Sequence, residues 1–135
     1  MSKLYRSREG NLTAIDTKTQ LTTLASESAP GPLLVPASAK MLKAIIACAV
    51  SDLGIAADCA IIARLEGPGL PEGPEVIAIG AAGVQVLTGG NGQVVAERFE
   101  LDIPVTVANE ILVFAEQTGE DMQTINVGIT LEFVT

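Results

Sequence analysis

The chain has 135 residues and a mass of 13.9 kDa, a length that favours one domain with a sizeable core. Hydrophobic residues make up 48% and charged residues 18%, which excludes an intrinsically disordered protein. The chain has no histidine, and this excludes histidine general bases, Ser-His-Asp and Cys-His nucleophilic sites and the commonest zinc ligand sets. The formal net charge is −8, so most of the surface should repel nucleic acid.

The first 18 residues differ in charge from the rest of the chain. They hold four basic side chains against two acidic ones, whereas the remaining residues hold four basic against fourteen acidic. We predict a basic amino-terminal arm over residues 1–20 that contacts a neighbouring subunit or, weakly, nucleic acid; the alternative is a solvated tail. The residues that would carry such contacts are Lys3, Tyr5, Arg6 and Arg8. The arm contains no apolar run typical of a signal peptide or membrane anchor, so we expect synthesis in the cytoplasm and no membrane span.

Residues 38–66 permit two interpretations. Apolar residues recur every three or four positions from Leu42 to Leu53, between a possible N-cap at Ser38 and a stop at Gly54, which indicates an amphipathic helix. Several of them are β-branched, however, and the rest of the chain has the pattern of β structure. We therefore predict a hairpin of two strands, 40–51 and 58–66, joined by a turn at 52–57.

The two cysteines of the chain, Cys48 and Cys59, fall on these two strands. In the predicted hairpin they would face each other at a distance that permits a disulfide. The alternative is two buried, reduced thiols, the usual state of cysteine in the cytoplasm. Neither has a base nearby in the sequence, so we do not expect a catalytic thiol.

Glycine and proline punctuate the middle of the chain. Their clusters at 67–74, 80–83 and 89–92 leave a short strand at 84–87 between two turns. Residues 97–105 then alternate, with apolar side chains at 99, 101, 103 and 105 and charged side chains at 98, 100 and 102. Pro104 cannot donate a ladder hydrogen bond, so this strand must end, bulge or lie at a sheet edge there.

The last 13 residues give the clearest strand. Every odd position from Ile125 to Phe133 is apolar and the even positions are small or polar, which predicts one face in the core and the other toward solvent or a neighbour. Residues 111–116 are apolar on both faces and run into a polar turn at 117–121. We predict that these two segments form a hairpin.

Acidic residues occur in three pairs that could in principle do acid-base work or bind calcium. Each falls in a predicted turn or on the solvent-facing side of a strand, and no loop alternates oxygen ligands with a positioning glycine. We interpret the pairs as solvated surface. The sequence therefore predicts no catalytic residues, no metal site, no cofactor and no enzymatic activity. The pairs are Glu72 with Glu75, Glu100 with Asp102, and Glu120 with Asp121.

These elements predict an all-β protein, a single antiparallel β-sandwich of about eight strands over residues 21–135. In this pattern the chain resembles the single jelly-roll or β-sandwich capsid and virion-surface proteins of viruses. The resemblance rests on the arm at 2–8, the entry segment Leu33-Leu34-Val35-Pro36, the strand-sized segments, and the regions 101–105 and 131–133. It implies a jelly-roll-like fold, location in the virion and self-assembly with copies of itself and other virion proteins. The arm is much less basic than arms that package nucleic acid.

The hydropathy of the chain also indicates self-association. A mean hydropathy of +0.43 with 18% charged residues is high for a small monomer, whose surface must be polar and free of large apolar patches. We therefore predict a non-enzymatic structural subunit of a viral capsid or similar homo-oligomeric shell. The alternative is a soluble, lectin-like ligand-binding module. With only four aromatic residues, the chain has few to spare for a sugar-binding platform.

Overall fold

The computed structural model describes residues 2–22, 32–50, 60–70, 84–88, 95–107, 109–118 and 124–135. These residues form nine strands and no helix, so none of them lies in a helix suited to crossing a membrane. The strands are β1 (Lys3–Leu12), β2 (Thr19–Gln20), β3 (Leu33–Leu34), β4 (Met41–Val50), β5 (Ala60–Glu66), β6 (Val84–Thr88), β7 (Val95–Pro104), β8 (Glu110–Thr118) and β9 (Ile125–Val134).

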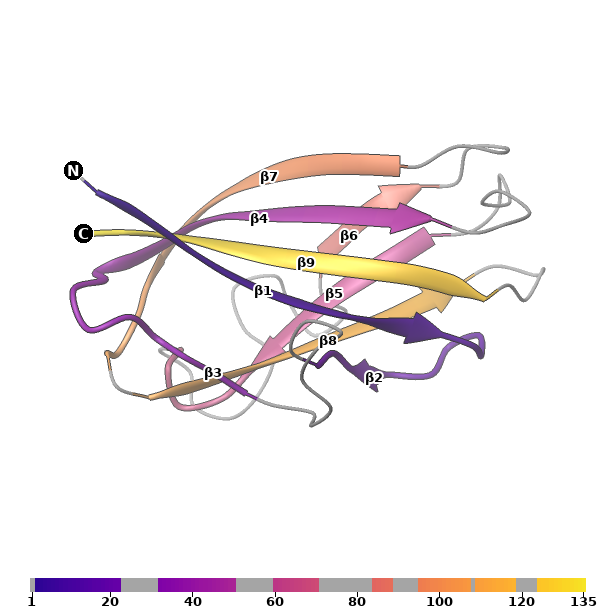
Figure 1. The fold of residues 1–135 in the computed structure, drawn as a ribbon, viewed down its shortest axis with the longest axis horizontal. Helices are drawn as coiled ribbons and strands as arrows, with labels where there is room; N and C mark the ends of the chain where they lie inside the picture. The colour runs from indigo at the N-terminus through magenta and orange to yellow at the C-terminus, as the bar shows by residue number, and fades with distance from the viewer. Residues whose placement is uncertain are drawn as a thin grey trace.

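The strands form two antiparallel sheets that pack face to face (Figure 1). The front sheet in that view has the order β1-β9-β4-β7, and the second has the order β2-β8-β5-β6, with β3 also paired to β8. Because β2 and β3 pair with successive parts of β8, they act as two pieces of one interrupted strand. Counted in this way, the first strand pairs with the eighth, the second with the seventh, the third with the sixth and the fourth with the fifth. This is the jelly-roll order, and it confirms the predicted sandwich of about eight strands.

The core lies between the sheets. The odd-numbered side chains of β9 from Ile125 to Phe133 are at most 2% exposed, which confirms the face predicted from their alternation. Along β7, Phe99 and Leu101 are half-buried against the core, whereas Arg98 and Glu100 are exposed, again as predicted. Across the sandwich the core is completed by Ile61, Ala63, Leu65, Ile111, Val113 and Ala115.

Both predicted hairpins are wrong, although all four of their strands exist. β4 pairs with β7 and β9 in the front sheet, whereas β5 pairs with β6 and β8 in the second. β8 and β9 are likewise in different sheets. The physical reason is that each of these strands buries one face. When the chain crosses to the other sheet, the two apolar faces meet in one core, which a flat hairpin does not achieve.

The predicted division into an arm at 1–20 and a sandwich at 21–135 also differs from the structure. Residues 3–12 are strand β1, which pairs with β9 along its whole length. Near the chain ends the N–H of Thr135 donates to the carbonyl of Ser2 (3.1 Å), so both ends lie together. The basic segment is therefore a border strand of the front sheet, because its backbone completes a ladder that its polar sequence did not suggest.

β7 forms the other border of the front sheet and ends at Pro104, as expected for a residue without an N–H. The short strand expected at 84–87 is β6.

A tight turn follows β5 at residues 67–70. Gly67 has φ +120°, and a Cβ at this position would lie 2.4 Å from the carbonyl oxygen of Glu110. The N–H of Gly69 donates to that same carbonyl (2.9 Å). The turn thus packs backbone against backbone on the start of β8, an approach that a side chain would prevent.

Candidate interaction surface

In the part of the chain that the structure describes, β1 has an open side, because it is the border of its sheet. Away from β9, its pairing begins only at Glu9, which exchanges two backbone hydrogen bonds with Thr22 (2.8 and 2.9 Å). Backbone groups alternate in direction along a strand, so those of Lys3, Tyr5 and Ser7 point the same way as those of Glu9. Residues 3–7 therefore present an open sheet edge to which another strand can be added.

Two of the predicted arm residues cover part of this edge. The guanidinium of Arg6 donates to the carbonyl of Tyr5 (2.9 Å), and that of Arg8 donates to the carbonyls of Ser7 (2.7 Å) and Pro32 (3.3 Å). The contacts satisfy edge acceptors and place positive charge along the edge. Charged side chains on an edge strand discourage unselective pairing with other chains.

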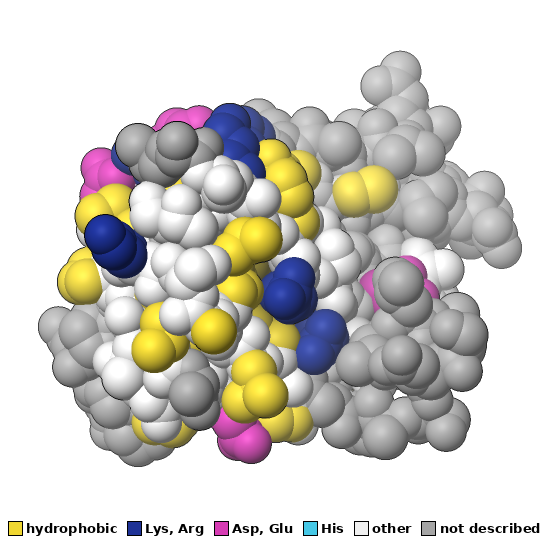
Figure 2. All heavy atoms as spheres, turned by 60° about the vertical axis from the view of Figure 1, so that its left-hand side comes forward, with side chains coloured by type: hydrophobic (Ala, Val, Ile, Leu, Met, Phe, Trp, Pro, Cys, Tyr) yellow, Lys and Arg dark blue, Asp and Glu magenta, His cyan; other side chains and the backbone are white. Residues whose placement is uncertain are grey.

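A groove of about 570 Å³ lies beside β1. Arg6 and Arg8 line it together with residues 32–37, which include β3. Leu34, one of the lining residues, is 59% exposed. Figure 2 views the end of the molecule that carries both chain ends and shows hydrophobic side chains gathered there, with Lys or Arg side chains beside them. The basic edge thus adjoins uncovered apolar surface.

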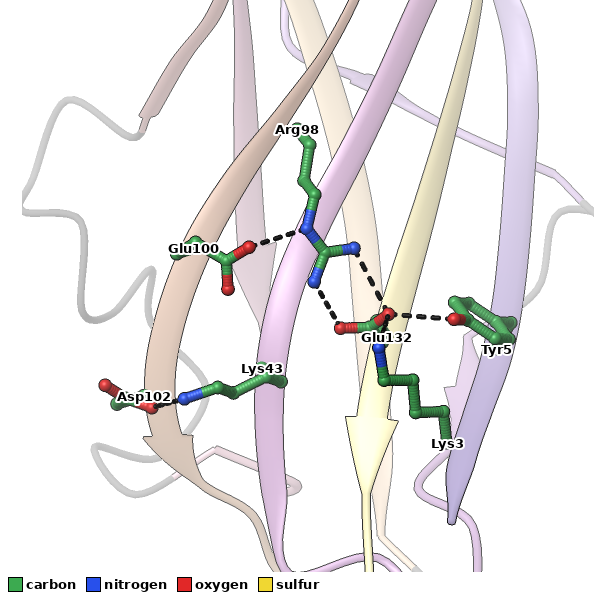
Figure 3. Close-up of polar contacts among 7 residues, drawn as sticks. All are labelled: Lys3, Tyr5, Lys43, Arg98, Glu100, Asp102 and Glu132. Carbon is green, nitrogen blue, oxygen red and sulfur yellow. Dashed lines mark hydrogen bonds and ion pairs between the residues drawn. The ribbon is translucent and has the colours of Figure 1, made fainter. Parts of the chain in front are cut away.

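A charged cluster on the outer face of the front sheet is centred on Glu132 of β9 (Figure 3). Although this face points away from the core, Glu132 is 1% exposed, because side chains from both border strands cover it. Arg98 of β7 donates to both carboxylate oxygens (2.6 and 3.1 Å), and the hydroxyl of Tyr5 donates to one of them (2.8 Å). The ammonium of Lys3 lies 3.8 Å away. The cluster therefore ties β1 to β7 across the two central strands.

These contacts fix the charge states of the cluster. The Arg98 guanidinium, with help from Tyr5, lowers the pKa of Glu132 from 4.5 to about 2 against the opposing effect of burial. The hydrogen bond to Glu132 raises the pKa of Tyr5, and the bonds to Glu132 and Glu100 raise that of Arg98. A carboxylate held this firmly in its charged form is unsuited to proton transfer near neutral pH. We interpret the cluster as a brace of the sheet.

Sequence reasoning missed the role of Glu132. Its even position on a regular strand predicts contact with solvent, and its partners are over thirty residues away along the chain. Glu100 and Asp102 do lie on an exposed face, as predicted, and bind Arg98 (2.6 Å) and Lys43 (2.5 Å). The other two acidic pairs of the sequence lie outside the described residues.

Of the predicted thiol pair, the structure describes Cys48 alone. Cys48 is exposed on β4, and its cross-strand neighbours are Gly128 of β9 and Ala96 of β7. β5 follows Cys59 in the sequence and lies in the other sheet. Cys59 itself lies outside the described residues, so the proximity of the two thiols stays a prediction.

The outer face of the second sheet carries two ion pairs of its own. Lys18 pairs with Glu66 and lies over the ring of Phe114, 4.4 Å from its centroid. Arg64 of β5 pairs with Glu116 of β8. In the part of the chain that the structure describes, no group of three or more Cys, Asp or Glu side chains could hold a metal ion.

Comparison with known proteins gives likenesses among solved structures alone. No family model matches the chain, and no curated protein matches it. Among solved structures, that of FLHE aligns over 100% of both chains with 12% identity and a TM-score of 0.46. A structure of infectious bursal disease virus, Gx strain, aligns with 98% of this chain and 32% of its own, with 11% identity and a TM-score of 0.45. The tobacco streak virus coat protein dimer aligns with 98% of this chain and 86% of its own, with 8% identity and a TM-score of 0.32.

Proposed function

We propose that this chain is a non-enzymatic structural subunit that assembles with copies of itself into a viral capsid or a similar shell, and that it resides in the virion. The observation that carries the proposal is the open side of β1 beside an uncovered apolar groove. A small monomer that kept both exposed would be prone to aggregate, so surfaces of this kind are ordinarily covered by a partner. The jelly-roll order is compatible with this role, since the fold is used by capsid subunits as well as by lectins and cupins.

Exposed apolar side chains support the same proposal. Leu34 of β3, Val107 and Tyr5 are 59%, 40% and 47% exposed. Leu34 borders the groove beside β1, and the mean hydropathy of the chain is +0.43. Burial of such side chains against neighbouring subunits would stabilise an assembly by about 25 cal/mol for each Å² of apolar area removed from water.

The charged residues described above favour a structural role over a catalytic one. Glu132 is bound by Arg98, Tyr5 and Lys3, and its pKa is about 2. Groups that brace a sheet in this way contribute rigidity instead of a titrating site. We propose only weak contact with nucleic acid, because Arg6 and Arg8 bind edge carbonyls and the body of the chain is acidic.

Size-exclusion chromatography with light scattering, followed by negative-stain electron microscopy, tests the proposal. We expect closed particles or large rings whose mass is a high multiple of 13.9 kDa. A chain that stays monomeric at high concentration, with no partner added, would overturn the structural role and favour the lectin-like binding module. A glycan array would then be the next measurement.

A further inference from the structure

The two border strands of the front sheet match each other in direction. Figure 1 shows β1 and β7 at opposite borders of that sheet. Each of its four strands is antiparallel to its neighbours, so the border strands run in opposite directions. A second copy placed beside the first, with its sheet in the same orientation, would therefore bring its β7 antiparallel to β1 and continue the hydrogen-bonded sheet.

Among the described residues, the backbone of β7 has an open side as well. The N–H of Val105 points toward β4 and bonds to the carbonyl of Lys40 (3.3 Å). By alternation along the strand, the backbone groups of Pro104 and Asp102 point toward the open side. Exposed and half-buried side chains alternate without interruption from Asp102 back to Arg98, so the backbone groups of Glu100 and Arg98 also point toward the open side. The open segment of β7 is therefore residues 98–102. The open segments of the two borders are thus five residues long on each strand.

The side chains of the two open segments are complementary. We propose, building on the proposed role as an assembling subunit, that the open edge of β1 takes β7 of a second copy, so that subunits join head to tail. In one register Lys3 lies opposite Asp102, and Arg6 lies beside the ring of Phe99. The full register pairs Lys3 with Asp102, Leu4 with Leu101, Tyr5 with Glu100, Arg6 with Phe99, and Ser7 with Arg98.

A β1 strand of a second copy is a poorer occupant of this edge. Antiparallel pairing of two β1 strands about the centre of their open segments would set Tyr5 opposite Tyr5 and Lys3 opposite Ser7, which leaves Lys3 without a carboxylate from the partner. On β7, by contrast, Glu100 and Asp102 are exposed acidic side chains. Charge complementarity therefore selects β7 over a second β1.

The groove beside β1 adds apolar contact to this pairing. A strand added to β1 directs its inner side chains to the same side as Leu4 and Arg6, which is the side of the groove. For β7 these are Phe99 and Leu101, both half-buried in the single subunit. Head-to-tail pairing would bring their exposed parts toward the apolar residues 33–36. The same contact would cover Leu34, which is 59% exposed.

Charge exchange tests the pairing. Lys3→Glu and Asp102→Lys each place like charges opposite one another, and we expect each to raise the subunit dissociation constant about tenfold. The combined variant restores an opposite pair and should return the constant to near the wild-type value. Sedimentation velocity over a range of concentrations measures all four proteins, and urea unfolding shows that each is folded.

A proline tests the backbone contact. Ser7→Pro removes an N–H that points to the open side, so it should block pairing while leaving the β1–β9 ladder intact. Ser7→Ala is the matched control: it loses the same hydroxyl contact to Thr130 (2.8 Å) but keeps the N–H. We expect assembly from Ser7→Ala and not from Ser7→Pro.

The outcomes separate the pairing from the wider role. If the wild type assembles and the charge and proline variants assemble equally well, the β1–β7 pairing is refuted and the structural role stands. Weaker assembly in both single charge variants without recovery in the combined one would also refute β7 as the occupant. A wild type that never assembles would refute both proposals.

Discussion

Replacement of Gly67 by alanine tests the turn that anchors the end of β5 to β8. At φ +120° an alanine is strained by about 1 to 3 kcal/mol. Its Cβ would also lie 2.4 Å from the Glu110 carbonyl oxygen, a contact that only backbone movement relieves, at a further cost of about 1 to 3 kcal/mol. We therefore expect Gly67→Ala to lower the free energy of unfolding by about 2 to 6 kcal/mol, a large part of the stability of a small domain.

Gly128 provides the matched control on β9. A Cβ added there would meet no atom within 4 Å, and the residue has no positive φ. Gly128→Ala should therefore be neutral or stabilise by up to about 1 kcal/mol, because alanine restricts the unfolded chain. Urea unfolding at one fixed protein concentration measures both variants, since assembly would otherwise add to the apparent stability. If the two variants unfold at the same urea concentration, the backbone contact between Gly67 and Glu110 is wrong.

Three other expectations follow from the described contacts. Ile129→Ala should cost about 2 to 4 kcal/mol and Thr130→Ala under about 1 kcal/mol in urea unfolding, because only the first side chain is in the core. The pKa of Glu132 is about 2 in the folded protein and ordinarily 4.5, so its contribution to stability is complete above pH 5 and declines as the pH falls toward 2. Glu132→Gln should flatten that decline in the free energy of unfolding. An unchanged pH profile of the free energy of unfolding would contradict the brace. Deletion of residues 2–10 should abolish cooperative unfolding as followed by circular dichroism, because it removes β1 from β9; a deleted chain as stable as the full one would show that the ladder contributes little.

The strand positions could be predicted from the sequence because they depend on local alternation. The odd residues from Ile125 to Phe133 and the half-buried Phe99 each follow the two-residue period that a sheet imposes. The helical interpretation of residues 38–54 is wrong over the described part of that segment, where β4 forms hydrogen-bonded ladders with β7 and β9.

Strand partners could not be predicted, because they depend on which faces must meet in the core. The polar sequence at 117–121 favours a hairpin, yet β8 continues through Thr118, and β8 and β9 lie in opposite sheets. For the same reason nothing near residues 3–12 marks them as a strand: their partner β9 is over a hundred residues away. The brace at Glu132 depends on Tyr5 and Arg98 in the same way, so it becomes visible only once the sheet order is known.

The ladder between β1 and β9 sets the timing of folding during synthesis. β9 lies between β1 and β4, so until the ribosome has made residues 125–134 the front sheet lacks one of its central strands. Pairings between such distant residues also carry a large loop-closure cost and are typical of proteins that fold slowly, over milliseconds to seconds. Nascent chains will therefore hold the apolar strand β4 without its partner β9 until residues 125–134 have been made, and unpaired apolar strands of this kind are prone to aggregate. Chains that stop before β9 cannot complete the front sheet, so the proposed assembly would exclude incomplete translation products.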